Sequence, residues 1–342
     1  MTTSPQGLDL ASLDRHLREV GIPRSGELRA EVIAGGRSNL TFLVSDDATK
    51  WVLRRPPLHG LTPSAHDMAR EYRVVAALQD TPVPVARAVT MRNDDEVSGA
   101  PFQMVEYVPG RVVRHAEDLE AIGAEKAISD CVDALIKVLA DLHAVDPEAV
   151  GLGDFGRAAG YLERQIRRWG SQWELVKRDN DPFDADVRRL HAALVEALPT
   201  QSRTSIVHGD YRIDNTILDN DDPTRVLAVL DWEMSTLGDP ISDAALMCVY
   251  RHPLFNVIHA SSAWASPTMP EADELANRYS VAAEQSLDNW DFYMALGYFK
   301  VAIIAAGIAF RAREGGGVAA DTDEVDKAVG PLMAEGLRAL GR

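Results

Sequence analysis

The stretch HGDYRIDN, residues 208–215, is the part of this sequence that decides the fold prediction. It sets His208, Asp210 and Asn215 at the spacing H-x-D-x-x-x-x-N, which is typical of a loop that catalyses phosphoryl transfer. Three fixed letters occur by chance about once in 8,000 positions. The residues that follow must therefore support the motif.

A hairpin is predicted directly after this stretch. Strand Thr216–Leu218 leads into a turn that contains Pro223, and strand Val226–Leu230 then runs straight into Asp231. Folding the hairpin about this proline brings its two ends together. The sequence therefore predicts that Asn215 and Asp231 are neighbours at the open end of the hairpin.

These three polar positions suit one kind of chemistry. An amide oxygen from Asn215 beside the carboxylate of Asp231 makes a hard-oxygen site for Mg²⁺. Asp210, five residues before Asn215, can accept the proton of an attacking hydroxyl. Asp214 is interpreted as either a spare metal ligand or a solvated acid. The alternative is that these acids are only turn and capping groups.

The first hundred residues offer a cation for the phosphate. The strand Trp51–Arg55 alternates its side chains, so Arg54 and Arg55 lie on opposite faces. Glu71 lies in the helix that follows, on an apolar stripe shared with Met68, Val75 and Leu78. A buried acid needs a basic partner, and we expect Arg54 to pair with Glu71. The alternative is that Arg55 is the inward residue.

A glycine turn lies between the first two predicted strands. Gly35, Gly36 and Ser38 offer backbone N–H groups and a small hydroxyl that could approach a phosphate. Most such glycines merely close hairpins. The sequence contains neither G-x-x-x-x-G-K-[ST] nor G-x-G-x-x-G, which disfavours P-loop and Rossmann nucleotide sites.

The order of elements predicts an α+β protein with two lobes and a kinase-like arrangement. Residues 1–108 are predicted as a small β-rich nucleotide-binding lobe with one helix that begins near Ser64. Residues 109–342 are predicted as a larger helical lobe that holds the catalytic loop and the acceptor site. Its expected helices cover about 119–145, 158–178, 183–198, 240–250, 270–286, 288–313 and 323–340.

Composition narrows the class of protein. The formal net charge of −17 argues against nucleic-acid binding, because a phosphate backbone favours a basic face. Cys131 and Cys248 lie in apolar helical patterns and are expected to be buried thiols. The N-terminus lacks the pattern of a signal peptide, and Met294–Phe310, with Lys300 inside it, is interpreted as a buried helix and not a membrane span. We expect a cytoplasmic protein that binds no membrane.

The chain resembles the aminoglycoside phosphotransferase and choline kinase-like superfamily. It is most similar to the branch that is related to the kinase-like module of acyl-CoA dehydrogenase fusion proteins. The resemblance covers Glu31–Arg251 and rests, in order, on AGGRSNLTF, WVLRRPP, REYRVVAAL, FQMVEYVPG, LADLHAVD, HGDYRIDN and LDWEMSTLGDPISD.

The resemblance implies roles for individual residues. It makes Asp210 the catalytic base, Asn215 and Asp231 the Mg²⁺ ligands, and Glu71 the acid that orients a phosphate-binding cation. It also implies that the backbone of Glu106–Val108 meets the adenine of ATP. One position departs from the pattern: many relatives have Lys where this chain has Arg54. Arginine keeps the positive charge, so nucleotide binding is expected to be retained. The rate of phosphoryl transfer is expected to be affected more, because the longer planar side chain could shift the γ-phosphate.

Several further residues receive structural interpretations. His208 is expected to hold the catalytic loop by hydrogen bonds, Asp239 and Pro240 to cap a helix, and His143 and Asp243 to be structural. One predicted helix carries side chains that could line an acceptor cleft, although core or surface roles fit most of them: Tyr161, Arg164, Arg167, Arg168, Trp169 and Trp173.

The expected activity is transfer of the γ-phosphate of ATP to a hydroxyl of a small-molecule acceptor, with a hydroxyacyl-type metabolite favoured. Two alternatives stay open: an aminoglycoside-modifying kinase, and a pseudokinase that only binds nucleotide. A protein acceptor is disfavoured, because Asp231 is followed within nine residues by the helix that begins at Pro240, which leaves no activation segment. The choice of ATP over GTP, the acceptor and the oligomeric state are left open.

Overall fold

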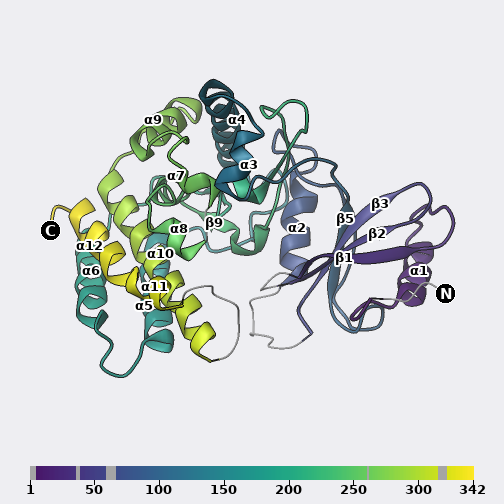
Figure 1. Ribbon diagram of the computed structural model, residues 1–342, viewed down its shortest axis with the longest axis horizontal. Helices are drawn as coiled ribbons and strands as arrows, with labels where there is room; N and C mark the ends of the chain where they lie inside the picture. The colour runs from purple at the N-terminus through teal and green to yellow at the C-terminus, as the bar shows by residue number, and fades with distance from the viewer. Residues whose placement is uncertain (1–4, 36–38, 59–66, 260–261, 315–321) are drawn as a thin grey trace. The chain divides into compact units, whose positions relative to one another are not determined.

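The computed structural model describes residues 5–35, 39–58, 67–259, 262–314 and 322–342. The chain folds as two compact units. The first contains Met1–Gly110 together with Leu227–Ser235, and the second contains Arg111–Val226 and Thr236–Arg342. An antiparallel sheet dominates the first unit and helices dominate the second, so the fold is α+β (Figure 1).

The first unit is built on a five-stranded antiparallel sheet in the order β1-β2-β3-β5-β4. Its strands are β1 (Arg29–Gly35), β2 (Leu40–Ser45), β3 (Lys50–Arg55), β4 (Ala88–Arg92) and β5 (Phe102–Glu106). Two helices accompany the sheet, α1 (Leu10–Glu19) and α2 (Met68–Leu78). The predicted hairpin and third strand are confirmed, whereas the prediction of a single helix missed α1.

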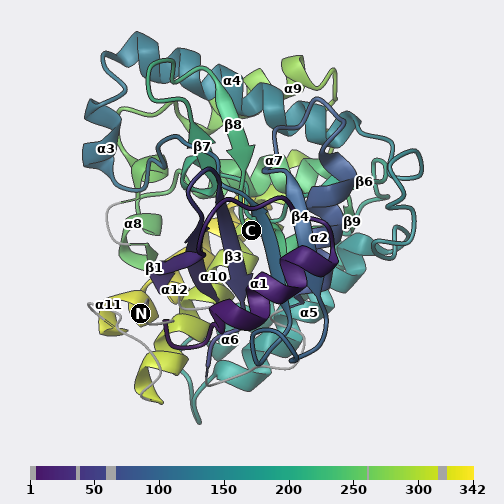
Figure 2. The same ribbon diagram turned by 90° about the vertical axis from the view of Figure 1, so that its right-hand side faces the viewer.

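Each of these two helices covers the sheet with an apolar stripe. Leu10, Leu13 and Leu17 of α1 join a buried core with side chains of the sheet, among them Phe42, Val44, Trp51, Leu53, Phe102 and Met104. Figure 2 shows α1 lying across the strands. Helix α2 packs on β4 and β5 and buries Met68, Glu71, Val74, Val75 and Leu78. Asp67 is its N-cap and accepts a hydrogen bond from the Arg70 N–H. Ser64, near which the helix was predicted to begin, lies outside the described residues.

The second unit is mainly helical. Its helices are α3 (Ala116–Glu120), α4 (Glu125–Ala144), α5 (Tyr161–Val176), α6 (Asp184–Glu196), α7 (Pro240–Val249), α8 (Phe255–Ile258), α9 (Ala272–Ala282), α10 (Trp290–Arg313), α11 (Thr322–Lys327) and α12 (Val329–Ala339). Short strands β6 (Ser205–Val207) and β9 (Thr236–Gly238) pair antiparallel. Strand β7 (Thr216–Leu218) follows the stretch 208–215, and β8 (Val226–Val229) begins in this unit and continues into the first.

Helix α10 forms the centre of the second unit and contacts α5, α6, α7, α11 and α12 (Figure 1). Gly297 lets α7 approach closely, because a Cβ atom there would lie 2.9 Å from Cγ2 of Val249. Among the described helices, α10 alone has the length and apolar composition of a membrane span, but most of its apolar stretch is buried inside the unit. It is a core helix, as predicted. Cys131 and Cys248 are likewise buried free thiols.

Candidate active site

The predicted pair of Arg54 and Glu71 is present in the first unit. Nη1 of Arg54 lies 3.2 Å from Oε2 of Glu71, and Nη2 lies 3.3 Å from Oδ1 of Asp231. The amide of Gln103 donates a hydrogen bond of 2.6 Å to the same Glu71 oxygen. Burial raises the pKa of Glu71, against the opposing charge of Arg54. The guanidinium therefore forms an ion-paired bridge between strand β3, helix α2 and the Asp231 segment.

The alternative cation, Arg55, has a different role. It lies on the other face of β3, is 5% exposed, and donates hydrogen bonds of 2.6 Å to the carbonyl oxygens of Gly7 and Ser98. These bonds tie the N-terminal segment and the loop before β5 to the sheet. Arg54 is therefore the residue that faces Glu71, and Arg55 is structural.

Asp231 has an unusual backbone. Its φ of 63° and ψ of 58° place it in the left-handed region, which a residue other than glycine adopts at some cost in free energy. Its carboxylate is about one-third exposed, and it precedes a 3₁₀ turn, Trp232–Met234. Arg70 of α2 donates to the carbonyl oxygen of Ser235 at 3.0 Å, which fixes the end of this segment. Strained backbone is frequent at functional sites, where the surrounding structure holds it in place.

In the second unit, the loop that carries the predicted catalytic residues is held through its backbone. Asp243 of α7 accepts hydrogen bonds from the N–H groups of His208 at 2.5 Å and Gly209 at 2.8 Å. Nδ1 of His208 accepts from the N–H of Asp210 at 3.2 Å, as expected for a residue that holds the loop. Gly209 has a φ of 83°, a conformation that favours glycine. The predicted structural roles of Asp243 and His208 are thus confirmed, and both act on the loop itself.

The carboxylate of Asp210 is surrounded by donors. The Tyr250 hydroxyl donates at 2.6 Å, the amide of Asn215 at 3.0 Å, and the guanidinium of Arg212 lies 3.3 Å from both oxygens. Burial alone would raise the pKa of Asp210, but Arg212, Tyr250 and Lys300 hold it well below its ordinary value. Asp210 is therefore ionised throughout the neutral range.

Arg212 and Tyr250 were not predicted as site residues. Arg212 joins Asp210 to Asp214, and its guanidinium lies over the rings of Tyr250 and Phe255, 5.6 and 5.4 Å from their centres. Asp214 is thus paired and largely buried, which corrects the interpretation of a solvated acid. Burial raises its pKa to about 6. The position of Arg212 inside the motif was a usable signal, whereas nothing in the local sequence connects Tyr250 with Asp210.

The two residues predicted to bind Mg²⁺ each carry a side-chain oxygen of the kind that this ion prefers. Asn215 directs its amide nitrogen to the main-chain oxygen of Asp210 at 2.8 Å and to the Asp210 carboxylate. This orientation leaves Oδ1 of Asn215 as an acceptor, and the partly exposed carboxylate of Asp231 offers another. Asn215 belongs to the second unit and Asp231 to the first, and their adjacency stays a prediction.

The remaining predicted nucleotide contacts are in the first unit. Gly35 ends strand β1, and Gly36 and Ser38 lie outside the described residues. Glu106 ends β5, where it pairs with Trp51 and donates its N–H to the carbonyl oxygen of Arg87 at 2.8 Å. Val108 follows two residues later, close to the end of this stretch of the unit. Their contact with adenine stays a prediction.

Two other predicted structural groups are confirmed. Asp239 caps α7, with Pro240 as the first helical residue. It is fully buried and accepts hydrogen bonds from the Ser202 N–H and hydroxyl and from the Tyr293 hydroxyl. His143, 1% exposed, contacts Tyr279 at 2.7 Å and Asp243 at 3.3 Å.

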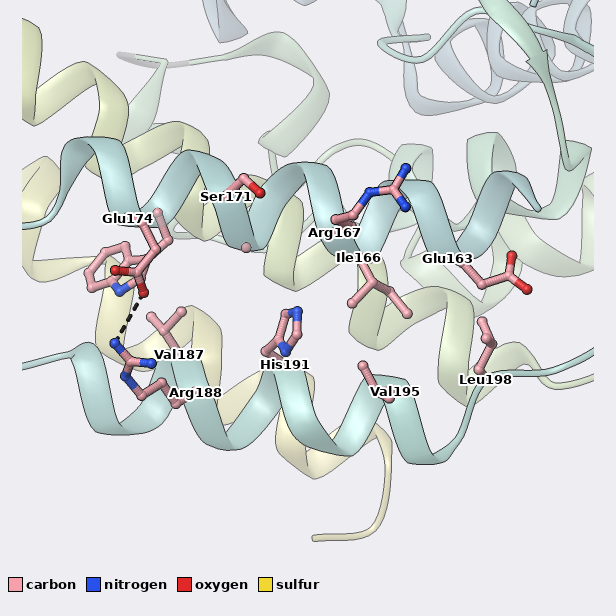
Figure 3. A pocket seen from close by; sticks show the side chains of 12 residues that line it. Glu163, Ile166, Arg167, Ser171, Glu174, Val187, Arg188, His191, Val195 and Leu198 are labelled. Carbon is pink, nitrogen blue, oxygen red and sulfur yellow. Dashed lines mark hydrogen bonds and ion pairs between the residues drawn. The ribbon is translucent and has the colours of Figure 1, made fainter. Parts of the chain in front are cut away.

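Helix α5 presents different residues to two sides. Tyr161, Gln165 and Trp169 line a small cavity of about 20 Å³ beside Gly209. On another side, Ile166, Gly170 and Trp173 line a groove of about 620 Å³ between α5 and α6. Figure 3 shows His191 of α6 standing in this groove and Arg167 pointing away from α6. Four of the six predicted acceptor-cleft side chains line one of these two spaces: Tyr161 and Trp169 the cavity, and Arg167 and Trp173 the groove. Arg164 and Arg168 line neither, and Asp210 does not line the groove.

The sequence comparisons agree with this geometry. The model of the phosphotransferase enzyme family matches residues 29–294. The mouse protein acyl-CoA dehydrogenase family member 10 is 33% identical over 311 residues, which cover 89% of this chain and 28% of the mouse protein. The chain thus spans about a quarter of the length of this relative.

Solved structures show the same fold. A Ralstonia eutropha protein with a provisional assignment as an aminoglycoside phosphotransferase is 32% identical, with a TM-score of 0.81 over 97% of this chain and 98% of that one. The aminoglycoside phosphotransferase APH(4)-Ia, solved with AMP-PNP and hygromycin B, has a TM-score of 0.63 at 14% identity and covers 96% of this chain and 98% of its own. Because the family model covers most of the chain, this protein belongs to the phosphotransferase enzyme family and has its kinase-like α+β fold.

Proposed function

We propose that this protein is a kinase that transfers the γ-phosphate of Mg²⁺-bound ATP to a hydroxyl of a small-molecule acceptor. The observation that carries the proposal is the arrangement around Asp210. Its ionised carboxylate and the oriented amide of Asn215 are held 3.0 Å apart on a loop fixed by Asp243. A pseudokinase would be expected to lack one of these groups.

In this mechanism Asp210 receives the hydrogen bond of the acceptor hydroxyl and orients its oxygen toward the γ-phosphorus. A carboxylate with a lowered pKa is a weak base, so it takes the proton late, when bond formation to phosphorus has made the hydroxyl acidic. This timing suits phosphoryl transfer, whose transition state is loose. The acceptor gains the phosphoryl group, ADP leaves, and the proton resides on Asp210.

The other predicted groups would bind the nucleotide. Arg54, held by Glu71, would contact the phosphates with its charged fork. Asn215 and Asp231 would hold Mg²⁺, which supplies charge neutralisation for the phosphates. The backbone at Glu106–Val108 would meet the adenine. Nucleotide complexes of a protein with the same fold support a nucleotide donor.

The proposed class of acceptor is supported by proteins that are similar to this chain. The likeness to acyl-CoA dehydrogenase family member 10 supports an acceptor related to acyl metabolism, such as a hydroxyacyl compound. The cytoplasmic location stays a prediction. The hygromycin B complex of APH(4)-Ia supports an aminoglycoside as the second candidate.

Two measurements test the proposal. Thermal melting with ATP, with and without Mg²⁺, should show a Mg²⁺-dependent stabilisation of about 2.7 kcal/mol at 100 times the dissociation constant. Asp231→Ala should lose it, and the control Asp221→Ala, in an exposed turn, should keep it. ADP release is then measured with hydroxyacyl-CoA compounds and with aminoglycosides, and the class that stimulates it identifies the acceptor. No stabilisation by ATP or GTP would refute the kinase.

A further inference from the structure

Lys300 connects the core of the second unit to the catalytic loop. It projects from α10, and its ammonium group donates a hydrogen bond of 2.5 Å to the carbonyl oxygen of Gly209. Gly209 directly precedes Asp210, so this carbonyl belongs to the peptide bond that carries the Asp210 N–H. Lys300 lies beyond the residues that the family model matches.

The two polar groups of Gly209 are bound from different helices. Asp243 of α7 accepts its N–H at 2.8 Å, and Lys300 of α10 donates to its carbonyl oxygen. A charged partner on each group makes both hydrogen bonds stronger than neutral ones. Because Gly209 has a positive φ and no side chain, these two contacts, together with the bond from the Asp210 N–H to Nδ1 of His208, determine the direction in which the chain leaves toward Asp210.

The ammonium group is buried beside aromatic and polar side chains. Nζ of Lys300 lies 5.6 Å from the centre of the Trp169 ring of α5, a cation–π distance. Together with Gly209 and Asp243, these side chains border the cavity of about 20 Å³. Such a space holds about one water molecule, so bulk solvent contributes little to the solvation of the ammonium group.

We propose that Lys300 is a positioning residue of the phosphotransfer reaction, which holds the Gly209–Asp210 peptide so that Asp210 is aimed at the acceptor. The inference rests on the proposed function. In its protonated form Lys300 binds the carbonyl oxygen strongly, and in its neutral form it does so weakly. The alignment of Asp210 is therefore sensitive to the charge of Lys300.

This charge responds to every ionisable group packed around it. Burial lowers the pKa of Lys300 to about 8. Asp210 of the loop and Asp243 of α7 favour the charged form, and Arg168 of α5 opposes it. Tyr161 and Tyr293 also border the cavity, and burial raises the pKa of both phenols, so they stay neutral in this range. Lys300 consequently loses its proton as the pH rises through about 8, and turnover should fall with it.

Three variants test the role of Lys300 through ADP release. Lys300→Met removes the charge at nearly constant size and should lower kcat about 100-fold, the effect of a misplaced catalytic group, with little change in the KM for ATP. Lys300→Arg should recover much of kcat and remove the decline of activity near pH 8, because arginine stays charged. Lys137→Met, at an exposed position on α4, is the matched control and should match the wild type.

Hydrogen–deuterium exchange of the peptide that covers residues 205–215 gives a readout without turnover. Exchange should accelerate in Lys300→Met and return to the wild-type rate in Lys300→Arg. Unchanged exchange and an unchanged pH profile in Lys300→Met would overturn the role of Lys300. A wild type that releases no ADP at any pH, with any acceptor, would instead refute the proposed function, so the two failures are distinguishable.

Discussion

The guanidinium of Arg54 lies 3.2 Å from the carboxylate of Glu71, a side chain that is only 3% exposed. Gln103 donates to the same carboxylate oxygen, and the second oxygen, Oε1, is buried without a hydrogen-bond partner among the described residues. The positive charge of Arg54 therefore offsets much of the free-energy cost of burying the ionised Glu71 carboxylate. Arginine can also reach Asp231 with the other arm of its fork, which the single ammonium group of a lysine does less readily.

Replacement of Arg54 by methionine should destabilise the first unit. The change leaves an ionised carboxylate buried without its counter-charge, which costs about 3 kcal/mol. The pKa of Glu71 is already raised, so the loss in free energy of unfolding caused by the substitution should become smaller as the pH falls and Glu71 binds a proton. Urea unfolding at pH 5 and pH 8 measures both effects. Arg54→Lys, the control that keeps the charge, should retain most of the stability, and an equal deficit at both pH values would contradict the explanation.

Asp210→Asn separates catalysis from nucleotide binding. Asparagine keeps the size of the side chain but cannot take a proton, so ADP release should fall by about 10²- to 10⁴-fold. Mg²⁺-dependent stabilisation by ATP should persist, because Asn215 and Asp231 are unchanged. Asp221→Asn in the exposed turn serves as the control. Turnover that survives in Asp210→Asn would favour a different base, and a wild type with binding but no turnover would favour the pseudokinase.

Local patterns predicted most of the fold. Alternating apolar residues and the glycine turn identified β1 to β3, and Asp239 with Pro240 identified the start of α7. Helix α1 was missed although its signal is present: Asp9 caps it, and Leu10, Leu13 and Leu17 share one face. A single short apolar stripe does not by itself predict a helix, and α1 is stabilised by packing on the sheet that it covers.

Two long predicted helices are each divided in the structure. The helix expected at 119–145 is broken near Gly123, whose φ of 119° does not continue a helix. The helix expected at 323–340 ends at Lys327, and α12 restarts at Val329, which places Pro331 in a first turn, where a missing N–H is tolerated. In both places the apolar spacing is that of one continuous helix, but a residue with special backbone geometry interrupts it.

The site was predictable only where its residues share a motif. Asp210 and Asn215 come from one loop, and their contact follows from the spacing. Tyr250 reaches the loop from the C-terminal cap of α7, 40 residues along the chain from Asp210, and Lys300 reaches it from α10, 91 residues from Gly209. The helices that bring them close are arranged by tertiary packing, so their roles could not be read from spacing.

His143 should make stability depend on pH. Burial lowers the pKa of His143, so the folded unit keeps this ring neutral while the unfolded chain binds a proton below about pH 6.5. The contribution of the neutral His143 ring to the free energy of unfolding is therefore complete above pH 6.5. Below that pH the free energy of unfolding should fall, by up to about 1.4 kcal/mol per pH unit. Urea unfolding between pH 5 and 7.5 measures the slope. His143→Gln should be less stable than the wild type, and its free energy of unfolding should depend less on pH. The exposed control His115→Gln should keep the pH dependence of the wild type. A wild type whose free energy of unfolding does not change over this range would contradict the prediction.

Asp239 should matter for stability and not for chemistry. Its fully buried carboxylate accepts from the Tyr293 hydroxyl at 2.8 Å, from Ser202 twice at 2.7 Å, and from the N–H of Ile241 at 3.1 Å. Asp239→Ala removes the cap of α7 and leaves several buried donors without an acceptor, so we expect a loss of about 3 kcal/mol or more in urea unfolding. Ser202→Ala, which removes one donor and leaves the carboxylate bound, should lose about 1 kcal/mol. The KM for ATP should be unchanged at temperatures where Asp239→Ala is folded, whereas a raised KM with normal stability would place Asp239 in the nucleotide site.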